Sequence, residues 1–152
     1  MTHEYRLSAR LTVPNSLDET FAFFADASNL ARITPPELGF SIATPLPIEM
    51  REGALIDYTI KLWGFRMRWR TRIAVWEPGR QFVDEQLSGP YKKWVHTHRF
   101  AANANGGTDI DDEVVYALPF GLAGRFAAPV VRVQLKRIFR FRETQVARLL
   151  GV

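Results

Sequence analysis

The segment from Phe65 to Val75 constrains the fold more than any other part of the sequence. Apolar and polar residues alternate along it, and the side chains of a strand alternate between its two faces with the same period of two. A strand with one apolar and one strongly basic face fits a sheet that is covered on one side only. Folding about the next turn, Pro78-Gly79, sets Val75 opposite Phe82. The basic face carries Arg66, Arg68, Arg70 and Arg72.

The same period carries four titratable side chains onto the apolar face of the next three strands. Folding the chain about its Gly-rich and Pro-containing turns sets Asp84 opposite His96, and His98 opposite Asp112. Directly opposed residues have Cβ atoms about 4.5–5.5 Å apart, which is within hydrogen-bonding reach. The sequence therefore predicts two buried carboxylate–imidazole pairs, Asp84 with His96 and Asp112 with His98.

The elements on either side of this meander complete an α+β pattern. Residues Glu4 to Val13 alternate as a half-buried strand, and Ser16 with Glu19 forms a capping box that starts a short helix. A second short helical turn is predicted near Asn29 to Arg32, and a long helix from Leu122 to Leu150. The inward face of the long helix is expected to carry Phe126, Val130, Val133, Ile138, Phe141, Gln145 and Leu149.

Length and composition favour one globular domain. The chain has 152 residues, 47% of them hydrophobic and 24% charged, and it contains no cysteine. A chain of this length suits a single domain, 1–152, with one core. It lacks an apolar run of the roughly 18 residues that a membrane span requires, and its first residues do not resemble a signal peptide. We therefore expect no membrane span and a cytoplasmic location, while the oligomeric state is not predicted.

The net charge of +4 raises the question of an acidic partner. The basic residues are mostly arginines, but they are spread over several predicted elements instead of forming a basic tail. No nucleic-acid partner is therefore expected. The face of Arg66, Arg68, Arg70 and Arg72 could meet an acidic partner or an anionic lipid surface, although an exposed sheet face needs polar residues in any case.

The polar residues of the inner face favour a ligand-binding pocket. A sheet that curls around a helix without filling its own concavity leaves an apolar cavity, in which a few polar groups orient the ligand. The alternative is that these polar groups satisfy one another in a buried network that fixes the strand register. The predicted partner is a small, largely hydrophobic molecule. The predicted ligand-binding residues are Tyr58, Trp69, Phe82, Asp84, Gln86, Trp94, His96, His98, Phe100, Asp112 and Tyr116.

Acid–base catalysis is a second hypothesis for part of the same set. Histidine titrates near neutral pH, and a carboxylate that holds one ring nitrogen leaves the other free to accept a proton from a substrate. His96, His98, Asp84 and Asp112 are thus candidate catalytic residues for aldol cyclisation or dehydration.

Metal binding is a third hypothesis. The two histidines of one strand, with nearby carboxylates, resemble the ligands of some iron and zinc sites. The chain has no cysteine and only one further histidine, His3, so neither a metal nor another cofactor is predicted.

Several short motifs, taken in order, add a resemblance to a known family. They are Asn29-Leu30-Ala31-Arg32-Ile33-Thr34-Pro35-Pro36, Phe82-x-Asp84-x-Gln86, Gly89-Pro90-Tyr91, Trp94-x-His96-x-His98-x-Phe100, Gly107-Thr108, Asp112, Tyr116-x-x-Pro119 and Ile138-Phe139-Arg140-Phe141-Arg142. Over nearly the whole chain, their order and spacing resemble the START-like (SRPBCC) superfamily, and within it a bacterial ligand-binding branch. The superfamily includes polyketide cyclases, plant pathogenesis-related proteins and lipid-transfer domains.

The resemblance implies a helix-grip fold, in which a curved antiparallel sheet wraps around a long C-terminal helix and two short helices follow the first strand. It also implies a cavity for a hydrophobic ligand between the sheet and the long helix. Some lines of the superfamily are cyclases or dehydratases, so the resemblance leaves enzymatic activity open.

Overall fold

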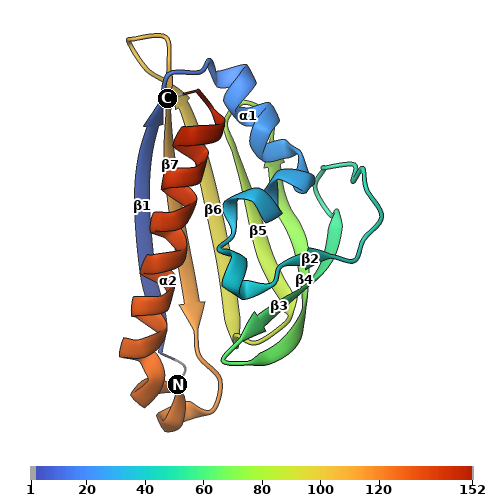
Figure 1. Ribbon diagram of the computed structural model, residues 1–152, viewed down its shortest axis with the longest axis vertical. Coiled ribbons are helices and arrows are strands. Elements are labelled where there is room, and N and C mark those ends of the chain that lie inside the picture. The colour runs from blue at the N-terminus through green and yellow to red at the C-terminus, as the bar shows by residue number, and fades with distance from the viewer. Residues whose placement is uncertain (1–2, 152) are drawn as a thin grey trace.

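The computed structural model describes residues 3–151. One sheet and a long final helix dominate it, with three short helical segments after the first strand (Figure 1). In chain order the elements are β1 (Tyr5–Val13), α1 (Leu17–Ala25), η1 (Ala27–Ile33), η2 (Pro36–Leu38), β2 (Ser41–Ile42), β3 (Leu55–Leu62), β4 (Phe65–Glu77), β5 (Gln81–Ser88), β6 (Lys93–Ala102), β7 (Thr108–Ala117) and α2 (Gly121–Leu149).

All neighbouring strands pair antiparallel, in the order β1-β7-β6-β5-β4-β3-β2. The sheet curves, and α2 lies against its inner face beside β1, β7 and β6 (Figure 1). The short segments α1, η1 and η2 cover part of the same face. This arrangement confirms the predicted α+β class and the helix-grip architecture.

The predicted register of the inner strands is confirmed at the polar positions. Asp84 pairs with His96, and His98 pairs with Asp112. These pairs persist because the two-residue period is unbroken along β5, β6 and β7. The four titratable side chains therefore share the covered face of the sheet.

The predicted pairing of Val75 with Phe82 is wrong. A register shift between Ile73 and Val75 adds a residue to β4, so that Val75 pairs with Val83 and Trp76 pairs with Phe82. Such a bulge reverses the faces of the residues beyond it. Trp76 consequently points inward, where its ring lies 5.4 Å from that of Phe82.

The inward face of α2 also differs from the prediction. Phe126, Val130 and Val133 are exposed, although Ile138 and Leu149 do pack against the core. The buried face begins with small residues, which let the helix approach the sheet closely and which a count of large apolar side chains overlooks. Its buried members are Gly124, Ala128, Val131, Leu135, Phe139 and Val146.

Within 3–151, no helix combines the length and the apolarity that crossing a bilayer requires.

Replacing Gly124 by alanine tests how closely α2 approaches the end of β7. A Cβ atom at this position would lie 2.2 Å from the carbonyl oxygen of Pro119, a backbone atom that cannot turn aside. Alanine in a helix is usually about 1 kcal/mol more favourable than glycine. Here we expect Gly124→Ala to lower the free energy of unfolding by about 1–3 kcal/mol, because it overpacks the contact.

Chemical denaturation measures this effect. Ala127→Gly, at an exposed position of the same helix, is the control and should lose only about 1 kcal/mol through helix propensity. A Gly124→Ala protein at least as stable as the wild type would contradict the close contact.

Candidate functional site

A cavity of about 180 Å³ lies between the inner face of the sheet, the short helical segments and α2. Its walls are mainly aromatic and aliphatic. Tyr58 and Trp69 stack with ring centroids 5.6 Å apart, and Trp94 meets Trp69 edge to face at 5.3 Å. The three rings come from β3, β4 and β6, and the two-residue period places all of them on the inner face of the sheet.

The cavity is lined by seven of the eleven predicted ligand-binding residues. These seven are Tyr58, Trp69, Phe82, Asp84, Trp94, His96 and His98.

The other four predicted residues pack outside the cavity lining. The Gln86 amide is held by the backbone of Tyr91, accepting from its N–H at 3.1 Å and donating to its C=O at 2.7 Å. Phe100 packs under α1, and Tyr116 is fully buried in the core cluster shared with α2. Asp112 lies behind the two histidines. Sharing a face was therefore not sufficient to reach the cavity.

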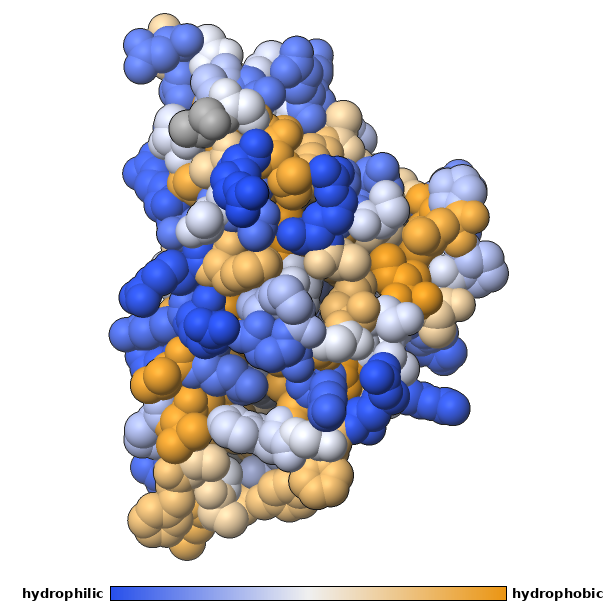
Figure 2. All heavy atoms as spheres, viewed as in Figure 1, coloured by the Kyte–Doolittle hydropathy of each residue, from blue (hydrophilic) through white to orange (hydrophobic). Residues whose placement is uncertain are grey.

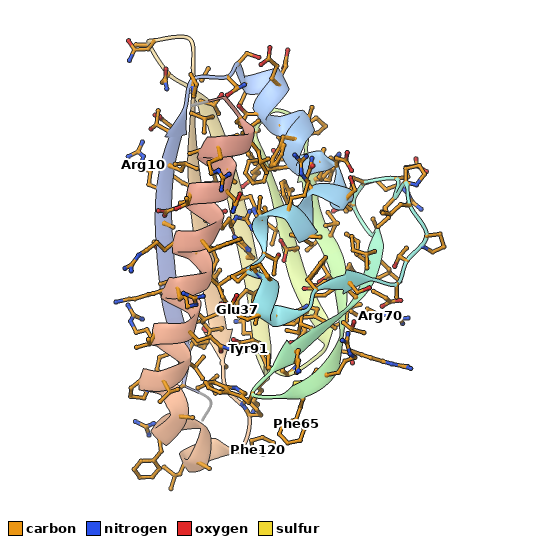
Figure 3. All side chains as sticks on the ribbon, in the orientation of Figure 1. Arg10, Glu37, Phe65, Arg70, Tyr91 and Phe120 are labelled. Atoms are coloured by element: carbon orange, nitrogen blue, oxygen red, sulfur yellow. The ribbon has the colours of Figure 1, made fainter. Side chains whose placement is uncertain are left out.

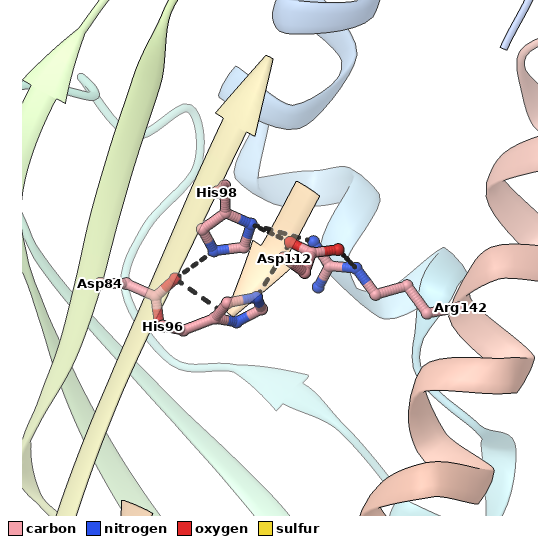
Figure 4. Close-up of polar contacts among 5 residues, drawn as sticks. All are labelled: Asp84, His96, His98, Asp112 and Arg142. Atoms are coloured by element: carbon pink, nitrogen blue, oxygen red, sulfur yellow. Dashed lines mark hydrogen bonds and ion pairs between the residues drawn. The ribbon is translucent and has the colours of Figure 1, made fainter. Parts of the chain in front are cut away.

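The polar cluster at the cavity wall consists of Asp84, His96, His98, Asp112 and Arg142 (Figure 4). His98 bridges the two carboxylates, with Nε2 2.6 Å from Asp84 Oδ2 and Nδ1 3.1 Å from Asp112 Oδ1. His96 Nε2 lies 3.0 Å from Asp112 Oδ1. The imidazole rings stack with centroids 3.6 Å apart.

The hydrogen bonds of this cluster run diagonally to the strand pairing. His96 bonds to Asp112, which is not its opposed residue, and its Nδ1 lies 3.9 Å from Asp84, beyond hydrogen-bonding distance. His98 bonds to its opposed residue and to Asp84 as well. The predicted pairing of Asp84 with His96 therefore holds for the strand register and for an ion-pair contact, but not for a hydrogen bond. Diagonal neighbours on adjacent strands are within reach of long side chains, and the ring nitrogens of the stacked histidines point toward the carboxylates on β5 and β7.

Arg142 of α2 completes the cluster from the side opposite the sheet. Its Nε lies 3.9 Å from Asp112 Oδ2, and its Nη2 lies 3.2 Å from His98 Nδ1. Burial alone would raise the pKa of Asp112, but the charge of Arg142 and the hydrogen bonds from both histidines hold it well below its usual value. The pKa of Asp84 is lowered in the same way, because the hydrogen bond and charge of His98 outweigh burial. Both carboxylates are thus ionised at neutral pH.

The two histidines are driven in opposite directions. Burial, followed by the neighbouring charge of His98, lowers the pKa of His96 to about 4. Burial also acts to lower the pKa of His98, but its bonds to Asp112 and Asp84 outweigh burial and raise it. Of the two histidines, His98 is therefore the one whose protonated form the cluster favours. Protonation of His98 sets two cations, His98 and Arg142, against the carboxylates of Asp84 and Asp112.

Comparison with known proteins identifies the fold. No family model and no curated protein matches the sequence. Among solved structures, the Zhui aromatase/cyclase from a Streptomyces species superposes with a TM-score of 0.76 at 17% identity, covering 97% of this chain and 94% of that one. Norcoclaurine synthase of Thalictrum flavum gives 0.71 at 12% identity, with 99% and 96% covered. A START superfamily protein of Mycobacterium smegmatis gives 0.69 at 13% identity, with 95% and 98% covered.

The chain has the helix-grip fold that these solved structures share. In this helix-grip protein, the cavity lies between the concave face of the sheet and α2, as the resemblance implied.

Sequence reasoning missed the residues that close the cavity from the helical side. Arg142 was noted within a motif but was given no part in the site. The segment 29–36 was also noted only as a motif. Its apolar residues do not follow a regular helical or strand period, so the sequence gave no reason to place it over the sheet. The lining residues from these elements are Phe23, Phe24, Asp26, Ala27, Asn29, Leu30, Ile33, Thr34, Leu38, Phe40, Leu135, Ile138, Phe139 and Arg142. Of the four members from α2, Ile138 was on the predicted inward face, and only the correct phase of the helix would have added Leu135, Phe139 and Arg142.

Metal binding has a specific geometric basis in this cluster. One ligand atom each from Asp84, His96 and His98 lies within 4.8 Å of the others. Two imidazoles and a carboxylate suit zinc or iron. The predicted absence of a metal stays a prediction, and metal analysis of the purified protein addresses it directly.

The opposite pKa directions of the histidines predict a stability maximum near pH 6.5. The unfolded form of His96 takes up its proton near 6.5 and the folded form near 4, so protons favour unfolding between these values. We expect the free energy of unfolding to fall by roughly 3 kcal/mol over this window, at about 1.4 kcal/mol per pKa unit. The stabilisation from His98 is complete below 6.5 and is lost as pH rises through its raised pKa.

Denaturant unfolding from pH 4 to 9 measures both limbs of this curve. His96→Gln should flatten the acid limb and His98→Gln the alkaline limb, because glutamine can donate a hydrogen bond but does not titrate. Equal flattening of both limbs by either variant would contradict the assignment.

Proposed function

We propose that this helix-grip domain binds a small, largely hydrophobic molecule in its internal cavity. The observation that carries the proposal is the cavity itself, with aromatic walls and a single polar cluster on one side. Such a combination is typical of ligand sites, where apolar walls provide affinity and a few polar groups provide orientation.

The size of the cavity limits the ligand. Its volume is about 180 Å³, and an engineered apolar cavity of about 150 Å³ in another protein accommodates benzene. We therefore expect a compact molecule of about one or two rings, or a longer one that enters only in part.

The polar atoms of the cavity walls suggest an oxygen function on the ligand. Trp69 Nε1 and Thr71 Oγ1 belong to lining residues, and both are buried without a hydrogen-bond partner among residues 3–151. A buried, unsatisfied polar group costs about 1–3 kcal/mol. Because the indole N–H can only donate, a carbonyl or hydroxyl oxygen would satisfy it.

His96 offers the complementary function. With its Nε2–H donated to Asp112, the neutral ring keeps a lone pair on Nδ1. This nitrogen can accept a hydrogen bond from a ligand hydroxyl. The expected ligand is therefore an apolar ring system that carries oxygen, such as a phenol or an aromatic ketone. The fold neighbours support the class in part, since one is an aromatase/cyclase.

Filling the cavity tests the proposal. Ile60 lines the cavity, and Ile110, which is also buried, does not. We expect Ile60→Trp to keep most of the stability, because the cavity receives the larger side chain, and to weaken binding of naphthol at least tenfold. Ile110→Trp should instead be destabilised by about 1–3 kcal/mol and retain binding.

Isothermal titration with 2-naphthol, and native mass spectrometry of the protein as purified, measure binding. Absence of binding by every aromatic alcohol and ketone tried, together with no copurifying molecule, would overturn the proposal. Equal destabilisation by both tryptophans would show that the interior has no room for a ligand.

Acid–base catalysis of cyclisation or dehydration is the second candidate, favoured by the lone pair of His96 at the cavity wall. A base with a pKa of about 4 is weak at neutral pH, which is why binding ranks first. If His96 is the base, His96→Gln should lower kcat/KM at least a hundredfold in a screen of β-hydroxy ketones, followed by enone absorbance. The kcat/KM of the wild type should be level above about pH 5. Full activity in the variant would exclude this role.

A further inference from the structure

The β3–β4 hairpin, the β5–β6 turn and the start of α2 lie at the same end of the molecule. Because neighbouring strands run in opposite directions, the turns after β3 and β5 and the last residues of β7 lie at the same end of the sheet. Lys92, in the β5–β6 turn, donates its backbone N–H to Ala117 at 3.0 Å, and lines a surface pocket with Leu122 and Arg125. Figure 3 shows Phe65 and Phe120 together at this end of the long axis.

Large apolar side chains are exposed at this end. Phe120 is 84% exposed, Phe126 85% and Phe65 69%. Figure 2 shows apolar side chains gathered at the lower end of the molecule, over the start of α2 and the hairpin. We call this set the aromatic end, which comprises Trp63, Phe65, Phe120, Leu122 and Phe126.

The backbone holds two of these aromatic residues in an unfavourable conformation. Trp63 has φ +55° and Phe120 has φ +68°, and they are the non-glycine residues of 3–151 with positive φ. A two-residue hairpin with positive φ at both central positions normally has Asn-Gly, whereas this chain has Trp63-Gly64. A bulky residue in this region is strained, and such strain persists at functional sites. An aromatic residue at either position therefore does not stabilise the backbone conformation found there.

The cations around the aromatic end have no acidic partners. Lys61, Arg66, Arg68, Lys92 and Arg125 are exposed, and the ion pairs within residues 3–151 involve other cations. The sequence also has no Asp or Glu between positions 113 and 143.

The four arginines on the exposed face of β4 differ in whether they form ion pairs within residues 3–151. Arg70 pairs with Asp57 and Arg72 with Glu85, so these two are satisfied within the chain. Arg66 and Arg68, nearest the hairpin, remain available. The free positive charge of this face is therefore concentrated beside the exposed aromatics.

We propose that the aromatic end docks on the surface of a membrane that contains anionic lipid. The interface of a bilayer takes both components, since aromatic rings settle at headgroup depth and Lys or Arg side chains pair with lipid phosphates. A second copy of the chain fits less well, because a symmetric contact would bring the same unpaired cations together. This inference is independent of what the cavity binds.

Vesicle co-sedimentation tests the docking. The wild type should bind vesicles of phosphatidylcholine with 30% phosphatidylglycerol, and bind pure phosphatidylcholine much more weakly. The double variant Trp63→Asn with Phe120→Asn should lower the partition coefficient at least tenfold. Asparagine tolerates positive φ, so we expect this variant to unfold at the same temperature as the wild type or higher.

Matched controls separate the aromatic end from a general surface effect. Leu55→Asn replaces an exposed apolar residue at the far end of β3, and should leave binding unchanged. Arg66→Glu with Arg68→Glu should lower partition at least tenfold, at about 1 kcal/mol per basic residue, whereas Arg80→Glu with Arg99→Glu should change it little.

Two results would overturn the proposal. One is absence of wild-type binding to the anionic vesicles, or binding that both double variants at the aromatic end leave intact. The other is a dimer in analytical ultracentrifugation that the asparagine variant dissociates, which would assign this end to contact between copies.

Discussion

The buried carboxylate of Asp112 is the group on which the site depends. An isolated charge in such a position would be too costly to keep, so it requires partners from every element that surrounds it. His96 and His98 approach it from β6, and Arg142 approaches from α2. The electrostatic requirement of Asp112 thereby links β7 and β6 to the last third of α2.

This requirement also explains why the cavity has one polar side. Asp84 accepts a hydrogen bond from His98 Nε2, and the two carboxylates that face His98 favour its protonated form. The polar groups must therefore gather where β5, β6 and β7 meet α2. The remaining walls are mainly aromatic and aliphatic, and their one carboxylate, Asp26, accepts hydrogen bonds from the backbone and hydroxyl of Ser28.

The parts of the fold that depend on alternation could be predicted from the sequence. The pairing of Asp84 with His96 followed from a period of two and from turns that keep it. The bulge that turns Trp76 inward could not be predicted, because a bulge leaves the local pattern of apolar residues intact while changing its phase. The phase of α2 was wrong for a related reason, since its inner face begins with Gly124 and Ala128. The contact of Arg142 with Asp112 joins residues thirty positions apart, and strand periodicity carries no information about it.

The charges of this protein are placed in two different surroundings, and added salt separates them. Those at the cavity wall are buried, mutually balanced and close together, so dissolved ions hardly screen them. Those beside Trp63 and Phe120 face water and are unbalanced, and a Debye length of about 8 Å at physiological ionic strength already weakens their reach. Added salt can therefore weaken the attraction of the aromatic end to an anionic membrane while the electrostatic interactions at the cavity wall are kept. Attachment to the membrane and occupancy of the cavity by a ligand are thus open to separate control.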